Sequence, residues 1–200
     1  MKKILFAIAF IVGGLATATA QSAKQVLDKC AQTVSNKSGV KADFTMQSAQ
    51  YGSARGTIAV KGRMFNASTA QATMWFDGKT LWTYMAKSDE VNVTTPTESQ
   101  LQALNPYNFI NLYKQGFKYT MTKSDKNYNV HLTATDQKRK IRELFIVVDK
   151  TSYQPTEVKM LQNSKWTTFT ITNLKATKLA DATFKFNSKD FPTAEIIDLR

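Results

Sequence analysis

The chain has 200 residues, of which 42% are hydrophobic, with 27 lysines and arginines against 15 aspartates and glutamates. A single cysteine excludes an internal disulfide, and the one histidine belongs to no His-x-x-x-His or Cys-x-x-Cys spacing typical of zinc sites. The composition therefore predicts a globular protein with a basic surface and without a metal or other cofactor.

The first 20 residues have the three-part pattern of a secretory signal peptide. Lys2 and Lys3 precede an apolar stretch over residues 4–15, and Ala-Thr-Ala at 18–20 is a small-x-small cleavage site. The apolar stretch is shorter than the roughly 20 residues that a membrane-spanning helix needs. We therefore predict an exported protein, cleavage after Ala20, and one mature domain over residues 21–200.

Cleavage would remove two of the 27 basic residues and leave a net charge of +10. In an exported protein this charge favours anionic lipid headgroups or an acidic protein partner over nucleic acid. The charges are scattered along the chain, which is equally typical of a solvated basic surface.

Apolar residues recur at helical spacing from Ala23 to Val34, and Ser22 is a suitable N-cap, so residues 22–36 are predicted to form an amphipathic helix. Beyond Gly39 the period changes to two, which is typical of half-buried strands. The predicted strands cover residues 42–46, 57–61, 64–67, the hairpin 75–84, 90–94, 117–122, 128–134, 140–148, 153–161, 166–174 and 183–186.

The hairpin at 75–84 reads WFDGKTLWTY. Asp77-Gly78 favours a tight two-residue turn with positive φ at both central positions. Two of the three tryptophans, Trp75 and Trp82, lie in this hairpin. So much aromatic area packs either in a core or against an apolar ligand, and the pattern leaves both open.

A helical insertion is predicted between the two groups of strands. Thr97 and Gln100 have the spacing of a capping box, Pro106 suits a first helical turn, and the apolar pattern ends near Gly116. The predicted fold class is mainly β with α: a curved, unclosed antiparallel barrel with an N-terminal helix and a mid-chain helical insertion. No nucleophile elbow or phosphate-binding glycine loop occurs, so the chain is not predicted to be an enzyme.

The run GTIAVK at 56–61, Phe65 and FDGKTLWTY at 76–84 resemble the periplasmic outer-membrane lipoprotein carrier family (LolA-type). The resemblance covers the whole mature chain and continues through the helix at 106–114 and a last strand ending at Phe186. It implies a half-barrel whose helices form a lid over a hydrophobic cavity for lipoprotein acyl chains. It further implies a periplasmic chaperone, expected to be monomeric, that receives lipoproteins from an inner-membrane releasing complex. Delivery would be to an outer-membrane acceptor or membrane surface.

Large apolar side chains are the candidates for binding the acyl chains, although ordinary core packing explains each of them equally well. Strand alternation leaves open which member of pairs such as Trp75 and Phe76 points inward. The candidate cavity wall is Phe44, Met46, Phe65, Trp75, Trp82, Tyr84, Phe145 and Trp166. The candidate lid is Leu101, Leu104, Phe109, Ile110 and Leu112.

Members of the family carry Lys-Arg-Pro where this chain has Lys61-Gly62-Arg63. The resemblance implies that this arginine holds the lid closed. Here Gly62 takes its position, and Arg63 and Arg55 are the candidate lid-lock residues. Adjacent strand residues point to opposite faces, so Arg63 replaces the family arginine only if the local register changes.

A second function is compatible with the same half-barrel. It could be a periplasmic lipid-binding or lipoprotein-sensing interaction domain without carrier activity. A sensor usually has an additional domain, and only a short tail is expected after residue 187, which favours the carrier.

Overall fold

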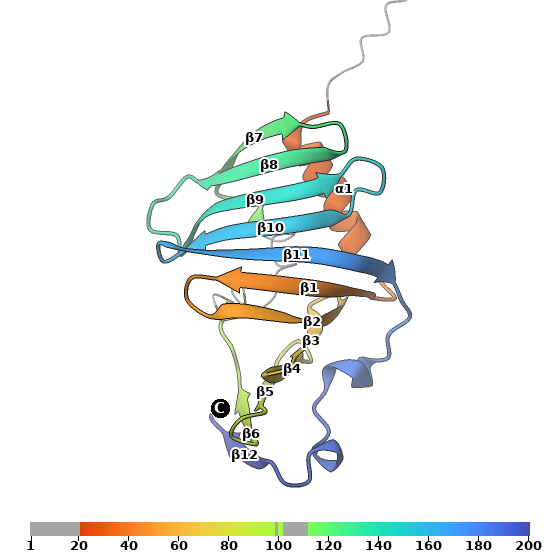
Figure 1. The fold of residues 1–200 in the computed structure, drawn as a ribbon, viewed down its shortest axis with the longest axis vertical. Helices are drawn as coiled ribbons and strands as arrows, with labels where there is room; N and C mark the ends of the chain where they lie inside the picture. Colours follow the sequence, from red (N-terminus) through yellow and green to blue (C-terminus); the bar gives the residue numbers. More distant parts are fainter. Residues whose placement is uncertain (1–20, 99, 102–111) are drawn as a thin grey trace, which may run out of the picture.

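The computed structural model describes residues 21–98, 100–101 and 112–200 (Figure 1). The predicted signal peptide and most of the predicted lid lie outside these residues. The described part contains the helix α1 (Ala23–Val34) and the 3-10 turns η2 (Asp181–Phe184) and η3 (Ser188–Asp190). Its strands are β1 Val40–Ser48, β2 Gly52–Lys61, β3 Met64–Thr69, β4 Ala72–Phe76, β5 Leu81–Met85, β6 Glu90–Thr94, β7 Phe117–Lys123, β8 Asn127–Ala134, β9 Ile141–Asp149, β10 Pro155–Gln162, β11 Lys165–Ala176 and β12 Glu195–Asp198.

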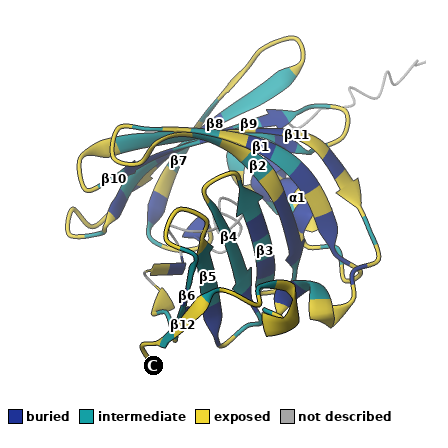
Figure 2. Ribbon diagram, turned by 60° about the horizontal axis from the view of Figure 1, so that its bottom comes forward, coloured by how far each residue is buried: buried dark blue, intermediate teal, exposed yellow. Residues whose placement is uncertain are grey.

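Within the described residues, these twelve strands form one sheet in the order β12-β6-β5-β4-β3-β2-β1-β11-β10-β9-β8-β7. The strands β12 and β7 are its two edges, so the sheet is curved but not closed, which confirms the predicted fold class (Figure 2). Neighbouring strands are antiparallel except at β12, which pairs in parallel with β6.

The helix α1 begins as the sequence predicted. The Ser22 hydroxyl accepts from the Gln25 backbone N–H at 3.2 Å, and the Gln25 side chain accepts from the Ser22 N–H at 2.8 Å. This capping box satisfies two helix-terminal donors. The buried face of α1, which includes Leu27 and Cys30, packs against the sheet core. No helix in the described ranges has the length and apolar character needed to cross a membrane.

The two faces of the sheet have different roles, and we call the face that packs with α1 the inner face. Along β1 the side chains of Val40, Ala42 and Phe44 are buried, while the alternate residues Lys41 and Thr45 are exposed. Strand residues alternate between faces, and paired residues share a face. The pattern along β1 therefore assigns every paired residue of the sheet to one face or the other. The inner face carries the main hydrophobic core, and we call the opposite face of the sheet the outer face.

The aromatic hairpin forms, but its turn differs from the prediction. Phe76 pairs with Leu81, so four residues connect β4 to β5 and only Gly78 among them has positive φ, at +101°. The Asp77 carboxylate accepts from the backbone N–H groups of Lys79 and Thr80 at 2.9 and 2.8 Å. This side-chain bonding gives Asp77 a turn role that needs no left-handed backbone, which explains the longer loop.

The C-terminal segment after β11 was also predicted incorrectly in part. Residues 183–186 were expected to form a strand, but Asp181–Phe184 is the 3-10 turn η2. Phe184 is buried against Ala59 on the outer face of β2, and the chain then continues to β12. The alternating apolar pattern of residues 183–186 therefore reflects side-chain packing against the outer face of the sheet, not backbone pairing with another strand.

Candidate functional site

The inner face supplies an apolar surface that extends over both halves of the sheet. Phe65 and Phe76 pair across β3 and β4, with ring centroids 5.5 Å apart. Phe44 and Phe169 meet across β1 and β11, at 6.3 Å. Half-buried methionines, including Met46, pack against the same core. Because methionine is flexible and fills irregular gaps, this surface is suited to ligands without fixed shape.

A pocket of about 530 Å³ opens at one end of this surface, a size typical of small-molecule sites. It is lined by Leu81 on the inner face of β5, by Tyr51 in the β1–β2 turn and by Leu199 after β12. Tyr51 and Leu199 remain 66% and 61% exposed. The other lining residues are Thr94, Thr95, Pro96, Gln100 and Arg200. We call this the rim pocket.

Strand pairing divides the eight predicted wall residues between the two faces of the sheet. Phe44, Met46 and Phe65 belong to the inner face and pack with its core. The remaining five lie on the outer face, as the strand pairing requires. Those five are Trp75, Trp82, Tyr84, Phe145 and Trp166.

The pairing partners explain this division. Phe76 pairs with the inner-face residue Phe65, so its neighbour Trp75 must point outward, together with its partner Trp82. Trp75 instead contacts Phe186 and Phe191 of the C-terminal segment, both at 5.5 Å between ring centroids. No pattern in the sequence indicated that this segment would cover the outer face.

A second aromatic group lies on the outer face, away from the C-terminal segment. Phe145 stacks on His131 with ring centroids 4.0 Å apart and contacts Trp166 at 5.8 Å. His131 also lies 2.9 Å from a carboxylate oxygen of Glu143. These side chains come from β8, β9 and β11, so they are neighbours only in the folded sheet. The described residues contain no cluster of three or more metal-binding side chains.

Only the ends of the predicted lid are described. Leu101 and Leu112 are buried and join the inner-face core. Leu104, Phe109 and Ile110 lie outside the described residues. The capping box predicted for the start of this insertion is confirmed, because the Thr97 N–H donates to the Gln100 side chain at 2.8 Å and the Gln100 N–H donates to the Thr97 hydroxyl at 3.3 Å.

The two candidate lid-lock arginines lie in different places. Lys61 pairs with Met64, so Gly62 and Arg63 form the loop between β2 and β3, with Gly62 at φ +59°. From this loop Arg63 forms an ion pair with Glu98, at the start of the mid-chain insertion. Arg55 pairs with Thr45 on the outer face of the sheet. Because Arg63 lies in this loop, strand alternation does not fix the face to which its side chain points.

A hydrogen bond connects α1 to the end of the mid-chain insertion. The Tyr113 hydroxyl donates to the Asp28 carboxylate at 2.7 Å, and Lys24 donates to the other carboxylate oxygen at 2.8 Å. The Lys24 and Tyr113 bonds lower the pKa of Asp28. Burial, followed by the bond to Asp28, raises the pKa of the Tyr113 hydroxyl.

An unclosed sheet with an apolar inner face and a pocket at its rim is the architecture of a protein that binds apolar ligands. The model of the family described as outer membrane lipoprotein carrier protein LolA matches residues 13–164. The chain belongs to this family, which confirms the resemblance seen in its sequence. The family is one of binding and carrier proteins. No curated protein sequence matches the chain.

Solved structures were compared with the whole chain. An uncharacterized conserved protein from Thermus thermophilus aligns over 89% of this chain and 99% of its own, with a TM-score of 0.59 and 13% identity, and it shares the fold. A LolA superfamily protein from Nitrosomonas europaea aligns over 84% and 99%, with a TM-score of 0.44 and 12% identity. LprF from Mycobacterium bovis aligns over 79% and 96%, with a TM-score of 0.42 and 10% identity.

Proposed function

We propose that the protein is a periplasmic carrier that holds the acyl chains of lipoproteins against its inner face and moves them from the inner to the outer membrane. The observation that carries this proposal is the apolar inner face that reaches the rim pocket. Each acyl CH₂ exposed to water costs about 0.8 kcal/mol, so an acylated protein needs such a cover to cross an aqueous compartment. The carrier would act as a monomer, after cleavage at Ala20.

In this mechanism the acyl chains enter at the rim pocket and pass along the inner face. Burial there is non-directional, so chains bind without specific hydrogen bonds and can leave again. Residues 101–112 would act as the lid, and the ion pair between Arg63 and Glu98 would hold its first turn to the β2–β3 loop. Both side chains are largely exposed, so this contact stabilises the closed form by at most about 1 kcal/mol and opens readily.

Two substitutions near the C-terminus test the route of entry. Leu199→Asp places a charge in the rim pocket, whereas Ile196→Asp places the same charge on the outer face of β12, where Ile196 pairs with Val91. Leu199 and Ile196 are 61% and 52% exposed, so both variants should fold. Burying a leucine is worth about 1.5–3 kcal/mol, so Leu199→Asp should weaken the uptake of a fluorescent fatty acid about tenfold or more. Equal uptake by both variants would contradict entry at the rim pocket.

Native mass spectrometry of the protein purified from its own periplasm tests the cargo. A co-purified di- or triacylated lipoprotein would support the carrier. Free phospholipid or glycolipid would support general lipid transport instead. A protein that carries nothing and takes up no acyl probe would favour the interaction-domain alternative.

A further inference from the structure

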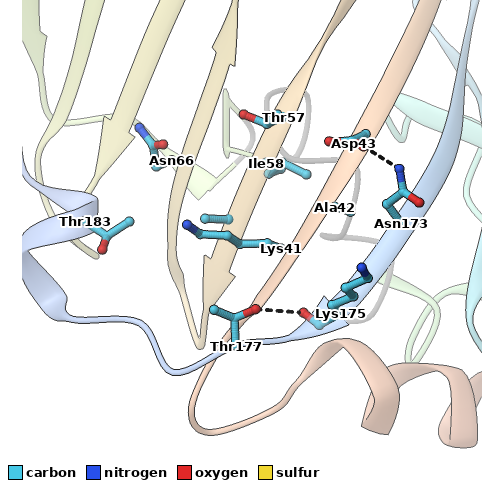
Figure 3. A pocket seen from close by; sticks show the side chains of 11 residues that line it. Lys41, Ala42, Asp43, Thr57, Ile58, Asn66, Asn173, Lys175, Thr177 and Thr183 are labelled. Atoms are coloured by element: carbon cyan, nitrogen blue, oxygen red, sulfur yellow. Dashed lines mark hydrogen bonds between the residues drawn. The ribbon is translucent and has the colours of Figure 1, made fainter.

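A second pocket, of about 340 Å³, lies on the outer face of the sheet, opposite the acyl-binding surface (Figure 3). It is formed where β1, β2, β3 and β11 face the C-terminal segment. Its lining mixes charged and polar side chains with apolar ones: Lys41, Asp43, Thr57, Asn66, Asn173, Lys175, Thr177 and Thr183 stand beside Ala42, Ile58 and Ala59. We call it the outer pocket. Its chemistry differs from that of the apolar inner face, so it needs a separate explanation.

The wall of the outer pocket is fixed by contacts that the C-terminal segment makes with β2. Lys61 donates to the Leu179 carbonyl at 3.0 Å and to the Asp181 carboxylate at 2.9 Å. Leu179 and Phe184 are buried against Ala59 on the same strand. Thr183, which lies between these anchors, is thereby held at the pocket. The outer pocket is therefore preformed rather than created by a bound ligand.

An irregularity of the sheet shapes the other end of the pocket. The pairing of β1 with β11 shifts between Lys41 and Asp43, and Asn173 in this bulge has a left-handed backbone with φ +53°. Asparagine adopts this conformation more readily than most non-glycine residues, because its short polar side chain can hydrogen-bond locally. Here the bulge directs the Asn173 side-chain amide to the Asp43 carboxylate, to which it donates at 2.6 Å. The bulge thus orients an acidic group within the pocket.

Two lysines, Lys41 and Lys175, supply the basic groups of the pocket. Among the described residues, Lys41 takes part in no ion pair or hydrogen bond through its ammonium group, whereas the neighbouring Lys61 has two acceptors. In Figure 3 the Lys41 side chain extends towards Asn66 and Thr183, away from Asp43. Lys41 and Asp43 lie two residues apart on one face of β1, so their Cα atoms are about 7 Å apart. The pocket therefore presents two ammonium groups and one carboxylate, and Lys41 is directed away from that carboxylate.

We propose that the outer pocket binds a phosphate ester that carries an amine a few bonds from the phosphate. The phosphate would bind the Lys41 ammonium and the Thr183 hydroxyl, and the amine would bind the Asp43 carboxylate that Asn173 orients. Charge-assisted hydrogen bonds at both ends would give specificity. A plain anion would leave the Asp43 carboxylate without an amine partner, and a plain amine would be repelled by Lys41 and Lys175. The same chemistry occurs in soluble amino phosphates and in aminophospholipid headgroups.

Titration calorimetry with O-phosphoethanolamine tests the proposal on the mature protein. Lys41→Gln should weaken its binding about tenfold or more, and Asp43→Asn should do the same, because each removes one charge-assisted contact. Asparagine at 43 can still accept from Asn173, so the bulge should persist. Lys118→Gln, which removes an exposed charge from β7, is the control and should bind like the wild type.

Inorganic phosphate and ethanolamine serve as partial ligands, and each should bind more weakly than the complete ester. Equal binding of inorganic phosphate and the ester would overturn the proposal, as would undetectable binding or unchanged affinity in Lys41→Gln. Vesicles with and without phosphatidylethanolamine identify the source. Selective binding to the former supports a lipid headgroup, and binding of the soluble ester alone supports a soluble ligand. Because the pocket lies on the outer face, these results are independent of acyl-probe uptake.

Discussion

Asp28 is the residue at which the N-terminal helix and the end of the mid-chain insertion meet. Its carboxylate accepts hydrogen bonds from Lys24 and from the buried Tyr113, and these bonds lower its pKa from the ordinary value of 3.8. A carboxylate with a lowered pKa in the folded state stabilises that state above its unfolded pKa. This contribution is lost as the pH falls through the lowered, folded-state pKa.

We therefore expect Asp28→Asn to change the acid limb of the stability profile. Near neutral pH the variant should be less stable by about 1–3 kcal/mol, because Tyr113 loses a charged acceptor. Below the ordinary carboxyl pKa this difference should shrink, since the wild type also loses the charge. Urea unfolding across the acid range measures both effects. Asp125→Asn, in the exposed turn between β7 and β8, is the control, and an equal effect in both variants would contradict a specific role of Asp28.

At the scale of elements, the C-terminal segment joins the outer face through a cluster of aromatic rings. Phe191 contacts Tyr84 at 4.6 Å and both Trp75 and Phe186 at 5.5 Å between ring centroids. Beyond this cluster, β12 completes the sheet by pairing with β6. The cluster is thus the attachment that precedes the last strand.

Phe191→Ala should loosen this attachment. The truncation removes three ring contacts, each worth about 0.5–1.5 kcal/mol, so amide exchange in β12 should become at least tenfold faster. Phe145→Ala is the matched control, because it removes an aromatic side chain from the outer face without touching the segment. Hydrogen exchange read by mass spectrometry distinguishes them. Unchanged exchange of β12 in Phe191→Ala would show that its pairing with β6 suffices.

At the scale of the whole molecule, the charge excess of the mature chain governs weak association. With a net charge of +10 over residues 21–200, the protein should bind vesicles rich in phosphatidylglycerol at low salt. The screening length falls from about 10 Å at 0.1 M salt to about 3 Å at 1 M. Vesicle binding should therefore largely disappear at 1 M salt. Co-sedimentation measures it. Binding that persists at high salt would indicate apolar insertion instead, whereas acyl-probe uptake should change little with salt.

Much of the fold followed from local patterns. The capping box at Ser22, the helix over α1 and the strands of both sheet halves were recognisable, because helical and strand periods differ. The parallel pairing of β12 with β6 could not be recognised from the sequence, because the two strands lie about a hundred residues apart. A short strand such as Glu195–Asp198 becomes a strand only when an edge is available to it.

The candidate site was predictable to a smaller extent. Strand pairing puts Phe44, Met46 and Phe65 on the inner face and Trp75 and Trp82 on the outer face, a division that the sequence left open. A period of two divides each strand into two sets of side chains but does not say which set faces inward. Leu199 and Tyr51 at the rim pocket carried no sequence signal, because isolated exposed apolar residues are common.

The elements and the family could be read from the chain, because hydrophobic period, caps and the WFDGKTLWTY hairpin are properties of neighbouring residues. Which faces carry the candidate sites depended on tertiary contacts. Strand register turned Trp75 outward, the C-terminal segment then covered it, and the bulge at Asn173 oriented Asp43 in the outer pocket. Each of these outcomes depends on contacts between distant segments, whose geometry exists only once the sheet has packed against α1 and its own C-terminal segment.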